Sequence, residues 1–380
     1  MQSCERAAIS FRRPKNRTLT RIDWETGGTR RLYPAYRDGT SGTDCLAYGS
    51  RLSQLVLRTR AQTTQSSFTE DLMNILMTGA TGLVGTALVK TFTVEGHTIY
   101  RLTRAETATR SAPGAGVFDV PWNPGSGEIR GSDVPGSLQV PVDALINLAG
   151  APVVGGRWTK DRKALLRSSR VDTTRGLVSA IAKMEKRPQV LISASAIGYY
   201  GNRGDEVVTE KSAPGTNFLA DLAKEWESEA VKAGEFGVRV VLLRFGIILA
   251  KEGGALPKMM LPFRFGLGGR LGSGRQWMSW IALHDVVAII QAALRSHGWS
   301  GPVNLVAPGA MRNSDFTKAL AKVMRRPAIF AAPAFALRLA MGEMADTLLG
   351  GVRVAPQILE QHGYRFLHPN LEEALNAILG

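Results

Sequence analysis

Cysteine and histidine, side chains that often bind metals or act as nucleophiles, are scarce in this chain. The two cysteines, Cys4 and Cys45, both precede Met73, and the five histidines show no HExxH or other paired spacing. From Met73 onward the sequence therefore excludes a disulfide framework, a thiolate nucleophile and a cysteine-ligated zinc site. Because the soft and imidazole ligands are missing, we predict no protein-bound metal.

Long apolar runs are missing as well. No run reaches the roughly 18 to 20 residues that a helix needs to cross a bilayer, and no apolar secretory segment lies near Met1. We therefore expect no membrane partner and a cytoplasmic location.

Acidic residues are too few to balance the basic ones, and the net charge is +15. The first 72 residues hold 12 of the 47 basic and 7 of the 32 acidic residues, which leaves 35 and 25, or +10, for the rest. That charge is dispersed, and no basic stripe with interleaved aromatic residues accompanies it. Nucleic acid is therefore not an expected partner.

Residues 1–72 lack sustained periodicity and are rich in Arg, Ser and Thr. This composition is typical of an extension without a packed core. A genuine tail, an organellar leader and an upstream start codon before a natural start at Met73 would all account for it, although seven acidic residues argue against a leader. In each case we expect the segment to be dispensable for chemistry.

From Met73 onward, short apolar runs alternate with helical patterns. This order predicts an α/β fold, a Rossmann-type doubly wound parallel sheet, with ligands at the carboxyl ends of its strands. We predict a nucleotide-binding domain over residues 73–245 and a smaller substrate-side α/β region over 246–380. A strand at 303–306 should join the nearby sheet.

The glycine-rich turn "GATGLVG" lies between the first predicted strand and the first predicted helix. Gly79 permits a tight turn, Gly82 lets a pyrophosphate approach the backbone, and Gly85 lets the helix pack on the strand. The strand–turn–helix context makes this a prediction of dinucleotide binding. The other residues of the turn expected to contact the cofactor are Thr81, Leu83 and Val84.

The end of the next strand selects the cofactor. The sequence there reads Leu102-Thr103-Arg104, and the first acidic residue, Glu106, follows two positions later. An acidic side chain would repel the 2′-phosphate of NADP, whereas a guanidinium can bind it through two hydrogen bonds. We therefore predict NADP(H), with Thr103 and Arg104 as contacts, although Arg104 could also be an ordinary surface residue.

Several separated segments resemble one protein family. They include "TGATGLVG", "NLAG", "SASAIGYYGNRGDE", "FLADLAKEWE" and "LRFGIILAKEGGALPKMM". The 308 residues from Met73 resemble the YfcH-type epimerase family, an atypical branch of the extended short-chain dehydrogenase/reductase superfamily with a C-terminal extension. The resemblance implies cofactor contacts at Leu148, Ala149 and Gly150. It also places Arg170 where the superfamily commonly carries Asn, so that Arg170 would either bind a cofactor phosphate or ribose or lie in solvent.

The tyrosine–lysine pair that ordinarily drives catalysis in this superfamily is absent. None of the seven tyrosines has a lysine four positions later, and Phe218 and Leu222 stand at this spacing on the helix expected to carry the pair. The remaining catalytic candidates are Ser195, expected to bind the substrate oxygen, and the two tyrosines Tyr199 and Tyr200. Both tyrosines could instead simply line the pocket. Further along the helix, Lys224 and Glu227 are expected at the surface.

Substrate contacts are expected in "GLGGRLGSGRQWMSW". Its arginines suit a phosphate and its tryptophans a ring, which makes Arg270, Arg275 and Trp277 the candidates; the tryptophans could equally pack at the domain seam. The resemblance implies an NADP(H)-dependent oxidoreductase or epimerase that acts by hydride transfer on a carbonyl or secondary alcohol. A small molecule, with nucleotide sugars among the candidates, would be the substrate, and a homodimer through two sheet-flanking helices would fit the superfamily. The alternative is a non-catalytic NADP-binding regulator involved in redox sensing or cell division.

Overall fold

The computed structural model describes residues 72–104, 116–129 and 141–380. The chain divides into two units, Met1–Phe68 and Thr69–Gly380, and every described residue belongs to the second. Apart from Leu72, the predicted N-terminal extension therefore lies outside the described residues.

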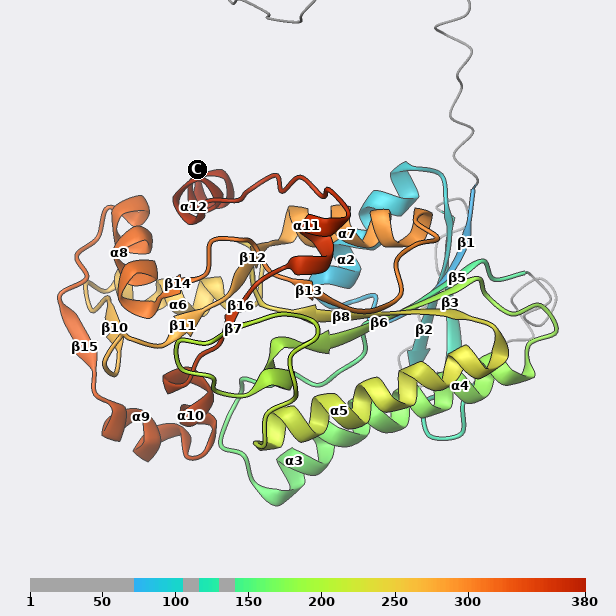
Figure 1. Ribbon diagram of the computed structural model, residues 1–380, viewed down its shortest axis with the longest axis horizontal. Coiled ribbons are helices and arrows are strands. Elements are labelled where there is room, and N and C mark those ends of the chain that lie inside the picture. The colour runs from blue at the N-terminus through green and yellow to red at the C-terminus, as the bar shows by residue number, and fades with distance from the viewer. Residues whose placement is uncertain (1–71, 105–115, 130–140) are drawn as a thin grey trace, which may run out of the picture. The chain divides into compact units, whose positions relative to one another are not determined.

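A sheet of eight strands forms the centre of the described unit (Figure 1). Its order is β13-β8-β6-β5-β1-β2-β3-β4, and all neighbours are parallel except β3 and β4. The strand order reverses between β1 and β5, which is where doubly wound sheets bind their ligands. The predicted Rossmann-type fold is thus confirmed. The strands are β1 (Asn74–Thr78), β2 (Thr98–Arg104), β3 (Val117–Asn123), β4 (Glu128–Ile129), β5 (Ala144–Asn147), β6 (Val190–Ala196), β8 (Arg239–Phe245) and β13 (Gly301–Leu305).

Alternate residues of each central strand face opposite layers, because side chains alternate along a strand. In β1, Ile75 and Met77 pack with one helical layer, whereas Leu76 packs with the other. Since both faces are covered, the central strands are apolar throughout. Figure 1 shows the two layers on opposite sides of the sheet. The first contains α2 (Leu83–Val94) and α7 (Leu283–Arg295); the second contains α3 (Lys160–Arg167), α4 (Thr173–Lys183) and α5 (Phe218–Val231).

The helical stretch from residue 160 to 183 is interrupted. Residues Ser168–Asp172 form a π-helical segment between α3 and α4. Such segments are rare and often occur at functional sites. Arg170, one of the predicted cofactor residues, lies within it.

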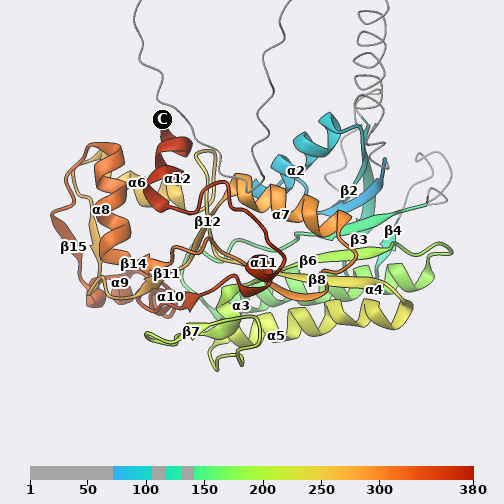
Figure 2. The same cartoon turned by 45° about the horizontal axis from the view of Figure 1, so that its top comes forward.

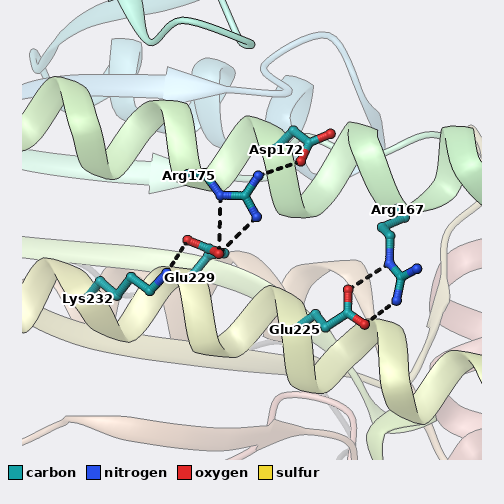
Figure 3. Close-up of polar contacts among 6 residues, drawn as sticks. All are labelled: Arg167, Asp172, Arg175, Glu225, Glu229 and Lys232. Atoms are coloured by element: carbon teal, nitrogen blue, oxygen red, sulfur yellow. Dashed lines mark hydrogen bonds and ion pairs between the residues drawn. The ribbon is translucent and has the colours of Figure 1, made fainter.

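Ion pairs connect α3 and α4 to α5 (Figure 3), and Asp172 of the π-helical segment and Lys232, the residue after α5, take part in them. Arg175 bonds to Asp172 and to Glu229, at 2.8 and 3.0 Å, and Lys232 bonds to Glu229 at 2.8 Å. Arg167 pairs with Glu225 further along. Apart from Glu229, at 10%, these side chains are 40% to 56% exposed, so each pair contributes no more than about 1 kcal/mol.

Most elements after β8, apart from α7, α11 (Gln357–Gln361) and β13, form a smaller group at one end of the described unit, in both Figure 1 and Figure 2. The chain nevertheless returns to the large sheet, where β13 pairs in parallel with β8. Residues 303–305 of the predicted strand thus form part of the edge of this sheet. The helices and strands of this group include α6 (Leu256–Arg264), β10 (Gly269–Leu271), β11 (Trp277–Met278), β14 (Met311–Arg312), α8 (Asn313–Met324), β15 (Phe330–Ala332), α9 (Ala334–Met341), α10 (Met344–Leu349) and β16 (Arg353–Val354).

In the described part of the chain, no helix combines the length and the hydropathy needed to span a membrane. The same residues contain no group of three or more His, Cys, Asp or Glu side chains arranged to hold a metal ion.

Candidate functional site

The turn between β1 and α2 requires glycine at two positions. Gly79 has φ +66°, and a Cβ on it would lie 2.5 Å from the carbonyl oxygen of Leu148 at the end of β5. A Cβ on Gly85 would lie 2.2 Å from the carbonyl oxygen of Gly79. Both distances are far below van der Waals contact, so the turn, the end of β5 and the first turn of α2 pack backbone against backbone.

The first turn of α2 has backbone N–H groups available for a ligand. Its N-cap is Gly82, no side chain caps it, and the turn contains no acidic residue. Thr81 and Gly82 are exposed, and Leu83 and Val84 are half-buried. Because uncapped N–H groups and the helix dipole both favour negative charge, this turn suits a phosphate.

A buried hydrogen-bond network fixes the segment that faces this turn. Thr78 Oγ1 donates to Asn147 Oδ1 at 2.7 Å and accepts from the backbone N–H groups of Leu148 and Ala149 at 3.1 and 3.2 Å. Asn147 Nδ2 donates to Thr174 Oγ1 on α4 at 2.8 Å. The network holds "LAG" beside the glycine turn. The periodicity of the sequence does not indicate this network, because its hydrogen bonds join residues 27 to 71 positions apart.

Arg170 lies directly behind this segment. Its side chain is 9% exposed, and its guanidinium donates to the carbonyl oxygens of Leu166 and Ala151 at 3.1 and 2.8 Å. A Cβ on Gly150 would lie 3.0 Å from the guanidinium carbon. Burial, together with the charge of Arg162, lowers the pKa of Arg170 to about 10, so that it remains protonated at neutral pH. Among the described residues it has no carboxylate partner, which is the expected arrangement where a ligand provides the anion.

The predicted contacts for a 2′-phosphate lie at the end of β2, next to β1 in the sheet. Arg104 is exposed, and Thr103 Oγ1 is buried without a hydrogen-bond partner among the described residues. Buried hydroxyl groups are rarely left unsatisfied, so Thr103 is compatible with a ligand contact. Glu106, the nearest acidic residue in the sequence, lies outside the described residues.

Ser195, at the end of β6, is part of a buried ionic cluster. Its hydroxyl donates to Glu227 Oε1 at 2.6 Å, and the Glu227 carboxylate accepts two hydrogen bonds of 2.8 Å from Arg244 on β8. Ser195 is 2% exposed, and the Arg244 and Glu227 side chains are 3% and 9% exposed. The expectation that Glu227 is a surface residue was therefore wrong. Its partners Ser195 and Arg244 lie opposite each other on the neighbouring strands β6 and β8, a pairing that no local sequence pattern indicates.

The two tyrosines after Ser195 differ in their surroundings. The Tyr200 side chain is fully buried; its hydroxyl donates to Asn304 Oδ1 at 2.6 Å and accepts from Arg244 at 2.9 Å. Burial raises the pKa of Tyr200 to about 12, against the opposing effect of Arg244. These contacts make Tyr200 the less available of the two tyrosines for proton donation. Tyr199 is half-buried, and the Arg244 guanidinium carbon lies 3.6 Å from its ring centroid.

Neither side chain at the tyrosine–lysine positions can replace the missing pair. Phe218, at the start of α5, packs edge-on against Trp158 at 5.3 Å between ring centroids. Leu222, one turn later, is 3% exposed and belongs to a small apolar cluster with Leu166 and Trp226. In the described structure the cation beside the two tyrosines is Arg244, which lies over the ring of Tyr199 and donates to the hydroxyl of Tyr200.

The predicted substrate residues are not equally available. Arg270 and Arg275 are exposed, and neither has an ion-pair partner among the described residues. Trp277 Nε1 donates to Asp205 at 2.8 Å, and the guanidinium carbons of Arg312 and Arg353 lie 4.2 and 4.6 Å from its ring centroid. Hydrogen bonds from Trp277 and Arg312 lower the pKa of Asp205. Two guanidinium groups thus already lie over the Trp277 ring, which leaves less of it available for stacking on a substrate.

Known proteins resemble this chain in sequence over most of its length. Residues 75–305 match the NAD dependent epimerase/dehydratase family, and residues 332–378 match a domain of unknown function, DUF1731. The epimerase family protein Mb2239 of Mycobacterium bovis is 41% identical over 302 residues, 79% of this chain and 96% of the relative. The chloroplastic SDR39U1 homolog of Arabidopsis thaliana is 37% identical over 316 residues, 83% of this chain and 89% of the relative.

Similar solved structures include the human epimerase family protein SDR39U1 (isoform 2), determined with NADPH. It has a TM-score of 0.69 and 30% identity, and the match covers 80% of this chain and 99% of the human one. The nucleoside-diphosphate sugar epimerase of Corynebacterium glutamicum has a TM-score of 0.64 and 31% identity, over 88% of this chain and 64% of that one. The resemblance seen in the sequence is thereby confirmed: the chain belongs to the NAD dependent epimerase/dehydratase family, with the C-terminal DUF1731 domain.

Proposed function

We propose that this protein is an NADP(H)-dependent oxidoreductase or epimerase acting on a carbonyl or secondary alcohol by hydride transfer. The observation that carries the proposal is the uncapped first turn of α2, packed against the end of β5 through Gly79 and Gly85. Such a turn has room and polarity for a diphosphate. The NADPH bound to the human relative supports the nicotinamide cofactor and the phosphorylated form of it.

The residues around the turn fit this cofactor. Thr103 offers an unsatisfied hydroxyl and Arg104 a cation at the end of β2, where the ribose and its 2′-phosphate would lie. Arg170 offers a buried guanidinium without a carboxylate partner beside Gly150. When bound, the nicotinamide would supply the hydride donor or acceptor, and the protein would supply orientation and charge.

Tyr199 is the proposed proton donor, because the structure leaves it the more accessible of the two tyrosines. Arg244 lies against its ring, so a cation is present even though no lysine follows the tyrosine in the sequence. Ser195 is the proposed contact for the substrate oxygen. Since its own hydrogen is committed to Glu227, the remaining lone pairs of Ser195 can only accept a hydrogen bond, which favours a substrate hydroxyl over a carbonyl.

The proposed substrate is a small molecule with an anionic group, for which Arg270 and Arg275 provide exposed cations. Nucleotide sugars are the first class to test, because the similar Corynebacterium glutamicum protein is a nucleoside-diphosphate sugar epimerase. A cytoplasmic location and a homodimer through the paired helices α4 and α5 are further proposals.

A non-catalytic NADP-binding regulator remains the second candidate. Its support is specific: Phe218 and Leu222 occupy the tyrosine–lysine positions, and the Ser195 hydroxyl is buried against Glu227. Both candidates require the cofactor, so cofactor binding alone does not separate them.

The test combines thermal unfolding with turnover. NADPH should raise the Tm, and NADH should raise it less, at equal concentrations well above the dissociation constants. Oxidation of NADPH at 340 nm, or reduction of NADP⁺, is then followed with ketones, alcohols and nucleotide sugars. Turnover supports the enzyme, and stabilisation without turnover supports the regulator. A Tm that neither NADPH nor NADH raises would refute the two candidates together.

A further inference from the structure

One end of the molecule exposes a concentration of large apolar side chains. The described residues expose 15 large apolar side chains, and seven of these belong to two short segments, residues 261–267 and 329–339. Four of these are about three-quarters exposed: Phe265 at 73%, Ile329 at 77%, Phe335 at 73% and Leu339 at 74%. We call residues 256–271 and 325–342 the apolar–basic surface.

The two segments form one continuous region, although 53 residues separate them in the sequence. β10 pairs in parallel with β15, with Gly269 opposite Phe330, and the N–H of Phe330 donates to the carbonyl oxygen of Gly268 at 3.2 Å. α9 begins two residues after β15, and both Figure 1 and Figure 2 show β15 and α9 at the same end of the molecule.

α9 is unusual among the helices because it buries none of its residues. Phe335 and Leu339 are four residues apart and therefore lie on one helix face, beside Arg338. A short helix with exposed Phe and Leu next to Arg is typical of segments that lie in the plane of a membrane surface.

The charge of this region is uniform in sign. Residues 256–271 and 325–342 contain six Lys and Arg and no Asp or Glu. All six basic side chains are exposed, and within the described structure only Arg338 has an ion-pair partner, Asp346. The six are Lys258, Arg264, Arg270, Arg325, Arg326 and Arg338.

We infer that the apolar–basic surface binds the surface of an anionic lipid bilayer. The positive charge of the surface distinguishes between the partners that could bind it. A second copy would bring a like-charged surface, and residues 1–72 carry a net charge of +5, so both would be repelled. Acyl chains adapt to projecting side chains of any shape, whereas a protein partner would need a matching pocket for each. The absence of spanning helices among the described residues does not bear on this surface association, and the inference differs here from the expectation of no membrane partner.

The test uses the full chain and sedimentation with vesicles of phosphatidylcholine alone or mixed with phosphatidylglycerol. We expect binding to the anionic vesicles that weakens as salt is added. F335S/L339S and R325E/R326E should each reduce the bound-to-free ratio about tenfold or more. Residues 1–72 are present in every variant, so their own charge cannot explain a loss.

Matched controls lie away from this surface. Val94, which is 83% exposed at the end of α2, provides V94S, and the exposed Lys183 and Lys186 provide K183E/K186E. These variants should bind as the unmodified protein does. All variants should keep the unmodified circular dichroism spectrum, because the replaced side chains are exposed.

Several results would overturn the inference. They are equal binding to neutral and anionic vesicles, no binding to either, and equal losses in the control and surface variants. A change of oligomeric state in F335S/L339S would assign the surface to a second copy. Binding of polyglutamate in place of vesicles would assign it to an acidic polypeptide.

Discussion

Removing Arg244 should destabilise the protein by much more than removing a surface cation. Its guanidinium donates two hydrogen bonds of 2.8 Å to Glu227, one of 2.9 Å to the hydroxyl of Tyr200 and one of 3.2 Å to the carbonyl oxygen of Glu210. Burial alone would lower the pKa of Arg244, but the hydrogen bonds and charge of Glu227 raise it overall. The pair is therefore ionised and almost fully enclosed.

R244M would leave the Glu227 carboxylate buried with Ser195 as its remaining described donor. An uncompensated buried charge of this kind costs about 3 to 5 kcal/mol of unfolding free energy. In the double variant R244M/E227L no charge remains, and similar apolar volume replaces the pair. We therefore expect the double variant to regain at least about half of the loss, as a coupling between adjacent sites.

Urea unfolding, followed by tryptophan fluorescence, measures these differences. K224M is the matched control, on α5, the helix that carries Glu227. Lys224 pairs with Asp221 at 2.7 Å, but the two side chains are 44% and 50% exposed. It should cost no more than about 1 kcal/mol. A loss in R244M as small as that in K224M, or a double variant less stable than R244M, would refute the view that this is a coupled buried pair.

Three further predictions test the cofactor turn, the cofactor preference and the buried tyrosine. G85A should abolish the NADPH-induced rise in Tm, because its Cβ would lie 2.2 Å from a backbone oxygen, whereas G234A, with no atom within 4 Å, should keep it; equal behaviour of the two would contradict the packing argument. R104E should weaken NADPH binding at least about tenfold while sparing NADH, measured by titration calorimetry, because like charges would face the 2′-phosphate; an unchanged preference would remove Arg104 from the site. The pKa of Tyr200 is raised from about 10 to about 12 in the folded protein. Its contribution to the free energy of unfolding, about 3 kcal/mol, is therefore complete below pH 10 and is lost as the pH rises toward 12. The unfolding free energy of Y200F should fall less steeply between these pH values, and a fall as steep as that of the unmodified protein would show that another group titrates there.

Local signals in the sequence predicted most of the part of the fold that contains the glycine turn. The strand–turn–helix containing Gly79 and Gly85 could be predicted because each residue acts through its neighbours in the chain, as do the alternating apolar runs of the sheet. The cluster around Glu227 could not be predicted in this way. Its members come from β6, α5 and β8, and their pairing depends on the register in which Ser195 lies opposite Arg244. A helix position that looks polar in the sequence is buried once two strands place a hydroxyl and a guanidinium beneath it.

The side chains that contact Trp277 could likewise not be predicted from the sequence. Tryptophan in a glycine-rich loop is compatible with a ligand-stacking role, and the sequence does not show which other side chains reach its ring. In the structure, Trp277 pairs through β11 with β14, which brings Arg312 over the ring, and Arg353 of β16 lies there as well. A cation over an aromatic face is favourable without any ligand. The surface of Trp277 is thus accounted for within the chain.

The absence of the tyrosine–lysine pair is more than a loss of two functional groups. Had the site merely lost its chemistry, position 222 would still face the crevice and would tolerate a polar residue. Instead Leu222 is buried with Leu166, Val171 and Trp226, so a lysine there would have to enter an apolar cluster. The cation that contacts a tyrosine ring comes from β8 and is held by Glu227 on α5, the same helix that carries the superfamily pair in other members. The arrangement therefore depends on a different set of contacts, and restoring the two residues alone would not recreate the superfamily site.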